Sequence, residues 1–153
     1  MTSLSHPRTA EILLVEDNED YLYLTQRAFG ETGYPANLHH VDNGERCLRF
    51  LRRQAPYGDA PVPDIVLLDL DMPVMDGRQV MAEIIADEAL KHIAVVVLTS
   101  RDEQAEVLRM YQLRCSSYIC KPAGFDSYVD MIQKFADYWL SVVMLPGRGA
   151  GRG

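Results

Sequence analysis

The fold is decided by the stretch Ile65–Pro73, which reads IVLLDLDMP. Its first four residues form a continuous apolar run with two β-branched side chains, a pattern typical of a strand buried on both faces of a parallel sheet. In open parallel sheets, ligands bind beyond the carboxyl ends of the strands. Asp69 follows the apolar run directly and is therefore the first candidate for a functional residue.

Three similar apolar runs lie elsewhere in the chain, and a more polar fifth segment would suit the edge of a sheet. Helical spacing of apolar residues fills the intervals between them, and Gly33 is expected to end the first helix. Strand and helix thus alternate five times, which predicts an α/β fold: a doubly wound, five-stranded parallel sheet with helices on both faces. The expected strands are 12–15, 37–41, 65–68, 93–98 and 118–120.

Length and composition fit one soluble globular domain. The chain has 153 residues, 48% of them hydrophobic, and its net charge of −7 argues against nucleic-acid binding. No apolar run reaches the roughly 18 residues that a membrane-spanning helix needs. The three cysteines lack metal-binding spacing, so we expect reduced thiols in or near the core of a cytoplasmic protein. One domain over 10–145 is expected between a flexible segment 1–9 and a flexible Gly/Arg-rich tail 146–153.

Polar residues that could carry chemistry follow four of the expected strands. Glu16 and Asp17 come after the first, Asp69 after the third, Thr99 after the fourth and Lys121 after the fifth. Converging carboxylates repel each other and need a cation, and oxygen ligands without histidine or cysteine suit a hard ion such as Mg²⁺. A metal, a lysine, a hydroxyl and a carboxylate nucleophile are the parts that phosphoryl transfer requires.

Four motifs carry a family resemblance over most of the chain, from Ile12 to about Trp139. In this order and at these separations, they resemble the response-regulator receiver domains of two-component signalling. That resemblance implies a flavodoxin-like receiver fold with strand order 2-1-3-4-5. The motifs are LLVEDN at 13–18, LLDLDMPVMDG at 67–77, LTS at 98–100 and YICKP at 118–122.

The resemblance also implies roles for the acidic residues. Asp69 would accept the phosphoryl group and bind Mg²⁺, which Mn²⁺ is expected to replace. Asp17 would bind the ion directly, and Glu16 would bind it directly or through water. The backbone carbonyl of Asp71 would be a further ligand. The Asp71 side chain is a departure, because many relatives carry asparagine or another residue there, and its effect on autodephosphorylation is left open.

The remaining motif residues would act on the phosphoryl group or respond to it. Lys121 would bind a phosphate oxygen, and Thr99 would be the switch hydroxyl. Tyr118 stands where the family has a rotating aromatic side chain, although a half-buried strand tyrosine is also an ordinary packing residue. Pro122 stands where the family commonly has a cis peptide bond before the proline.

A narrower resemblance, carried by 57–64 and 138–146, is to the stand-alone regulators that partner bacterial phytochrome histidine kinases. It implies such a kinase, possibly a bacteriophytochrome, as phosphodonor and a homodimer formed through the last helix and the tail. The output would be a protein–protein interaction or a relay to a histidine phosphotransfer protein, and the chain would not be an enzyme beyond its own phosphorylation and dephosphorylation.

Two other functions stay open at this point. A receiver fold could act as a phosphate-independent scaffold or dimer module. Alternatively, Asp69-Leu70-Asp71 after an apolar strand looks like the nucleophile and acid pair of haloacid-dehalogenase phosphohydrolases. Against the second hypothesis, that motif normally opens the chain, whereas here a strand ending in Glu16-Asp17 precedes it.

Overall fold

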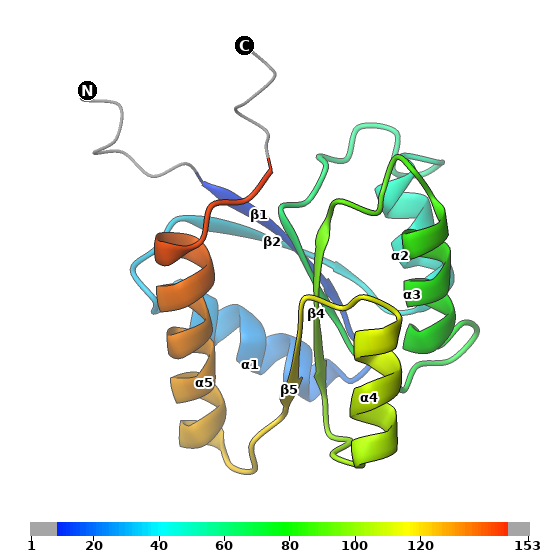
Figure 1. Cartoon of the computed structure of the whole chain (residues 1–153). Coiled ribbons are helices and arrows are strands. Elements are labelled where there is room, and N and C mark those ends of the chain that lie inside the picture. The colour runs from blue at the N-terminus through cyan, green and yellow to red at the C-terminus, as the bar shows by residue number, and fades with distance from the viewer. Residues whose placement is uncertain (1–8, 147–153) are drawn as a thin grey trace.

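The computed structural model describes residues 9–146 and shows five parallel strands in the order β2-β1-β3-β4-β5. The predicted α/β fold and strand order are confirmed (Figure 1). The strands are β1 (Ala10–Val15), β2 (Ala36–Val41), β3 (Ile65–Leu68), β4 (Ala94–Thr99) and β5 (Ser117–Cys120). The helices are α1 (Glu19–Gly30), α2 (Gly44–Leu51), α3 (Gly77–Ala86), α4 (Gln104–Gln112) and α5 (Phe125–Asp137), and a π-helical turn η2 (Tyr138–Val142) follows α5.

Alternate residues of the central strands face two separate cores. Leu13 and Val15 belong to a cluster with apolar residues of α2, α3 and α4, whereas Ile12 and Leu14 belong to a cluster with α1 and α5. Figure 1 shows the same division, with α1 and α5 on one side of the sheet and the other three helices opposite. Burial on both faces explains why β1 and β3 are almost uninterrupted apolar runs.

Side-chain caps start the helices nearest the strand ends. Asn18 accepts a hydrogen bond from the backbone N–H of Tyr21 at the start of α1. Asp76 and Gln79 form a reciprocal capping box at the start of α3. The prediction that Gly33 ends the first helix is wrong. The helix ends at Gly30, because the Glu31 N–H turns back to carbonyls of its last turn, and Gly33 with φ +87° lies in the following turn.

The end of the chain packs partly on its own body. Trp139, Leu140 and Leu145 contact the core cluster formed with α1 and α5, whereas Val142 and Met144 are exposed. Most of the two segments expected to be flexible, residues 1–8 and 147–153, lies outside the described residues. Cys47 and Cys115 are buried thiols, but Cys120 is exposed, contrary to the expectation for all three. No helix within residues 9–146 is long and apolar enough to cross a membrane.

Candidate functional site

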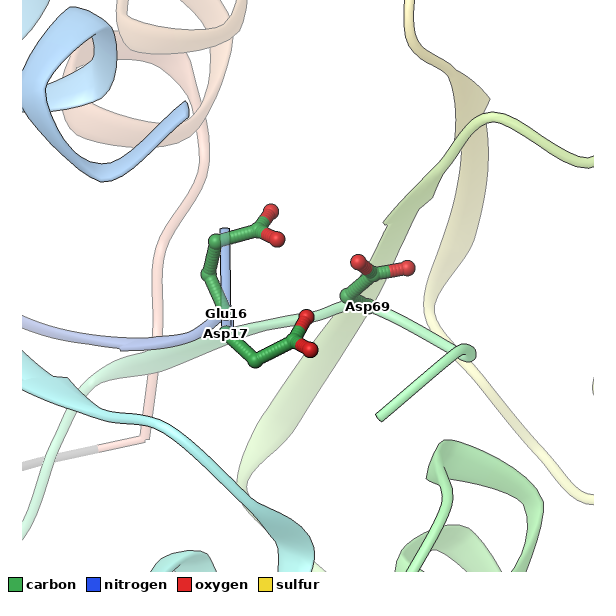
Figure 2. Close-up of side chains that lie close together, drawn as sticks. All are labelled: Glu16, Asp17 and Asp69. Carbon is green, nitrogen blue, oxygen red and sulfur yellow. The ribbon is translucent and has the colours of Figure 1, made fainter. Parts of the chain in front are cut away.

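Three carboxylates meet at the carboxyl edge of the sheet. Val15 at the end of β1 pairs with Leu68 at the end of β3, so the residues that follow these strands emerge side by side. Carboxylate oxygens of Glu16, Asp17 and Asp69 all lie within 4.8 Å of one another. Figure 2 shows the three side chains close together, with the Asp17 carboxylate pointing toward Asp69. Glu16 and Asp69 are buried and Asp17 is exposed, so the cluster opens to solvent on the Asp17 side.

Lys121 places a positive charge inside this cluster. Its Nζ lies 2.7 Å from Glu16 Oε1 and 3.4 Å from Asp69 Oδ2, and its side chain is only 3% exposed. The end of β5 holds it there, because the Lys121 backbone N–H donates to the Thr99 carbonyl at 2.7 Å. Burial raises the pKa of the Glu16 carboxyl to about 7, while the Lys121 ammonium acts in the opposite direction. Two buried carboxylates therefore share one buried cation.

The donor set fits a hard divalent cation. All three candidate ligands are carboxylates, and neither histidine nor cysteine belongs to the cluster. Mg²⁺ is usually held by one or two carboxylates and keeps several waters. The exposed Asp17 leaves one side open for such waters, and Glu16 and Asp69 bring negative charge from the buried side.

Thr99 and Tyr118 belong to the neighbouring strands β4 and β5, near the carboxyl edge of the sheet. Thr99 is the last residue of β4 rather than the first loop residue, and it is fully buried. The half-buried Tyr118 donates its hydroxyl to the carbonyl of Arg101 at 2.8 Å. Burial raises the pKa of the Tyr118 phenol to about 12, which keeps that hydroxyl protonated. Tyr118 therefore contacts the loop that follows Thr99.

The Asp71 carboxylate is paired with an arginine of the next loop, Arg101. The Asp71 backbone N–H donates to Asp69 Oδ1 at 3.3 Å, and both of its carboxylate oxygens lie 2.9 Å from Arg101 Nε. Our sequence reasoning missed Arg101. The available signal was its spacing, since Arg101 comes two residues after Thr99 as Asp71 comes two residues after Asp69. This ion pair joins the β3–α3 loop to the β4–α4 loop.

The start of α3 lies very close to the backbone of Asp69. A Cβ atom on Gly77 would lie 2.7 Å from the Asp69 carbonyl oxygen and 2.8 Å from the Leu70 Cα, so glycine is the residue that permits this approach. Asp76 serves as the N-cap of this helix. Its position agrees with helix-start chemistry rather than with a role among the converging carboxylates.

The expectation of a cis peptide bond before Pro122 is wrong. Within residues 9–146, the cis bond precedes Pro56 instead. The turn from β5 into α5 is made at Gly124, whose φ of 92° only glycine adopts readily.

Comparison with known proteins decides the family. Residues 12–133 match the model of the response regulator receiver domain. The chain belongs to the response regulator receiver family. Members of this family are signalling switches rather than classical enzymes, which removes the phosphohydrolase alternative as the primary interpretation.

Individual relatives show which members of the family this chain is similar to. The receiver is 36% identical over 135 residues to the response regulator Rcp1 of Synechocystis sp., which covers 88% of this chain and 92% of Rcp1. It matches the structure of the phosphorylated cyanobacterial phytochrome response regulator RcpA with a TM-score of 0.88 and 35% identity, over 92% of this chain and all of RcpA. It matches the Mn²⁺-bound form of Rcp1 with a TM-score of 0.86 and 35% identity, over 90% and 99% of the two chains. The receiver is thus similar to phytochrome response regulators over nearly their full length.

Proposed function

We propose that this receiver accepts a phosphoryl group from a histidine kinase onto Asp69. The observation that carries the proposal is the position of the buried Lys121 ammonium, 2.7 Å from Glu16 and 3.4 Å from Asp69, in a cluster that Asp17 opens to solvent. A cation beside a carboxylate nucleophile stabilises the negative charge of a phosphoryl group as it transfers. Bound Mg²⁺, held by Glu16, Asp17, Asp69 and the Asp71 carbonyl, would supply further charge neutralisation.

The transfer step balances without any other reactant. An Asp69 carboxylate oxygen attacks phosphorus, the bond from phosphorus to the kinase imidazole nitrogen breaks, and that nitrogen keeps the electron pair. Lys121 loses a carboxylate charge at Asp69 and gains a phosphate oxygen as its partner. Thr99 donates its hydroxyl to another phosphate oxygen, and Tyr118 responds to the resulting movement of the loop that contains Arg101.

The phosphodonor we propose is a phytochrome histidine kinase. Full-length similarity to Rcp1 and RcpA supports it, because RcpA is a cyanobacterial phytochrome response regulator. The receiver would form one domain spanning 10–145 and would act in the cytoplasm. Its signal would pass to a partner protein or to a histidine phosphotransfer protein. Phosphotransfer from a light-activated phytochrome kinase, compared with a kinase of another sensor class, tests this choice. Equal transfer from both would contradict it.

We also propose that the receiver forms a homodimer through α5 and the tail. A groove of about 560 Å³ runs along α5 and is lined by apolar and polar side chains that include Met131, Tyr138 and Trp139. Tyr138, which lines the groove, and Val142, at the end of the π-helical turn η2, are both exposed. Analytical ultracentrifugation of wild type and Val142→Asp tests the proposal, because a charge at the interface should shift the dimer to monomer. An unchanged mass distribution would contradict it.

Intact-mass spectrometry tests the acceptor directly. We expect one phosphoryl adduct after incubation with acetyl phosphate and Mg²⁺, and none in Asp69→Asn or with a chelator present. Asp59→Asn is the matched control, since it makes the same chemical change at an exposed loop position. If wild type gives no adduct with acetyl phosphate or with a kinase, the phosphate-independent scaffold becomes the better interpretation.

A further inference from the structure

Lys121 has a third partner besides the two carboxylates. Its Nζ lies 3.8 Å from the centre of the Tyr21 ring. A cation within about 6 Å of an aromatic centroid is attracted to the ring face, and the attraction is strongest where water is excluded. The Lys121 side chain is almost fully buried, so water is excluded and the attraction between the ammonium and the ring should be strong.

The Tyr21 ring is held firmly in place. It stacks at a tilt on Tyr128 of α5, with centroids 5.4 Å apart. The Thr25 hydroxyl donates to the Tyr21 carbonyl at 2.6 Å and lies 2.7 Å from the Tyr128 hydroxyl. A threonine hydroxyl has one hydrogen, so Tyr128 must be the donor in the second bond. These three residues of α1 and α5 form a closed hydrogen-bonded and stacked unit under Lys121.

The other partners of Lys121 change during phosphoryl transfer, and the ring does not. An Asp69 oxygen becomes bonded to phosphorus, and the Glu16 carboxylate would help to hold Mg²⁺ when the ion is bound. A ring face takes up no proton, binds no Mg²⁺ and is not a phosphoryl acceptor. It can therefore hold the ammonium at one place while both carboxylates change roles.

We propose that Tyr21 is the positioning residue for Lys121, and that its ring face keeps the ammonium at the phosphoryl-binding position before and after transfer. This inference rests on the proposed function of Asp69 as acceptor. It gives α1 and α5 an indirect part in phosphoryl binding, because they hold the ring that positions the lysine.

The test compares three variants of the full chain. Tyr21→Phe keeps the ring face, and Tyr21→Leu removes it. Phe29→Leu is the matched control, because Phe29 is buried in the same core and packs edge-to-face on Phe135, with centroids 5.9 Å apart. Each protein is assayed for the rate of labelling by acetyl phosphate with Mg²⁺ and for affinity for the phosphoryl mimic beryllium fluoride. The melting temperature shows how much each variant is destabilised.

We expect Tyr21→Leu to label about three- to thirty-fold more slowly and to bind beryllium fluoride correspondingly more weakly, the range that a buried cation–ring contact implies. Tyr21→Phe and Phe29→Leu should match wild type in both. Wild-type behaviour of Tyr21→Leu, or equal losses in Tyr21→Leu and Phe29→Leu, would overturn the inference. Absence of any adduct on wild type would instead count against Asp69 as acceptor, and beryllium fluoride affinity would still test the ring.

Discussion

Two ion pairs flank Asp69, and they differ chiefly in their exposure to water. On one side, the Lys121 and Glu16 side chains are each 3% exposed and lie 2.7 Å apart. On the other side, the Arg101 and Asp71 side chains are 43% and 47% exposed and lie 2.9 Å apart. A buried charge left without its partner is very costly, whereas exposed pairs are screened and contribute little. The buried side is thus suited to hold its geometry, and the exposed side is suited to open.

The exposed side is also the one that contacts Thr99 and Tyr118, the two residues proposed to act in the switch. Tyr118 donates to the carbonyl of Arg101, and Thr99 lies two residues before it. Arg78 and Glu106 join α3 to α4 nearby through two hydrogen bonds of 2.7 and 3.0 Å. A loop held mainly by exposed contacts can change position at little cost in free energy. We infer that a phosphoryl group on Asp69 shifts this side and leaves the Lys121 side in place.

The largest expected effect is that of Lys121→Met. In metal-free buffer at neutral pH it should lower the free energy of unfolding by about 3–5 kcal/mol, because Glu16 and Asp69 lose the cation between them. Urea unfolding measures the change, and Arg101→Met is the control. Added Mg²⁺ should restore part of the loss. Similar losses in the two variants would show that burial does not separate the two sides.

Gly77→Ala should have the second-largest effect, because the added methyl group would press on the backbone of Asp69. A methyl group there would lie 2.7 Å from the Asp69 carbonyl oxygen and 2.8 Å from the Leu70 Cα. Both are backbone atoms, so a side-chain rotation cannot relieve the clash and α3 or the Asp69 backbone must move. We expect a loss of about 1–3 kcal/mol in the free energy of unfolding, together with slower labelling of Asp69. Gly58→Ala is the control, since nothing lies within 4 Å of a Cβ there. Wild-type labelling by Gly77→Ala would contradict a rigid acceptor.

The third effect, intermediate in size, comes from the proton that competes with Mg²⁺ for the Glu16 carboxylate. Because its pKa in the folded protein is raised from 4.5 to about 7, the folded state binds this proton more tightly than the unfolded state does. The resulting stabilisation is present at low pH and is lost as the pH rises from about 4.5 to about 7.

Glu16 must lose this proton before its carboxylate can bind Mg²⁺. Mg²⁺ affinity should therefore fall roughly tenfold between pH 8 and pH 6, measured by calorimetric titration. Glu16→Gln should bind Mg²⁺ more weakly but lose most of this pH dependence. An equally steep dependence in that variant would assign the proton to another group.

The buried and exposed sides of Asp69 also differ in how well the sequence predicts them. Continuous apolar runs identify β1 and β3, and position after a run identifies Glu16, Asp17 and Asp69, because parallel strands end at one edge. These features depend on burial, and a short run of apolar residues is enough to indicate a buried strand. Lys121 was predicted in the same way, as the residue after β5.

The errors and omissions lie in turns and exposed loops. The end of α1 at Gly30 rather than Gly33 depends on backbone hydrogen bonds that residue types do not dictate. The Asp71–Arg101 pair joins two loops 30 residues apart in sequence, and neither residue is part of a periodic pattern. Loop conformation is set by such tertiary contacts, which a single sequence does not reveal.

The smallest expected effect is that of Arg101→Gln. Removing an exposed ion pair should change the free energy of unfolding by only about 0.2–1 kcal/mol. A double-mutant cycle with Asp71→Asn in urea unfolding isolates the interaction itself, because each single variant removes the same contact. A coupling within this range would agree with a loop that opens easily. A coupling of several kcal/mol, comparable to the Lys121 effect, would mean that the exposed side is held as firmly as the buried one, and the movement on phosphorylation would then have to begin elsewhere.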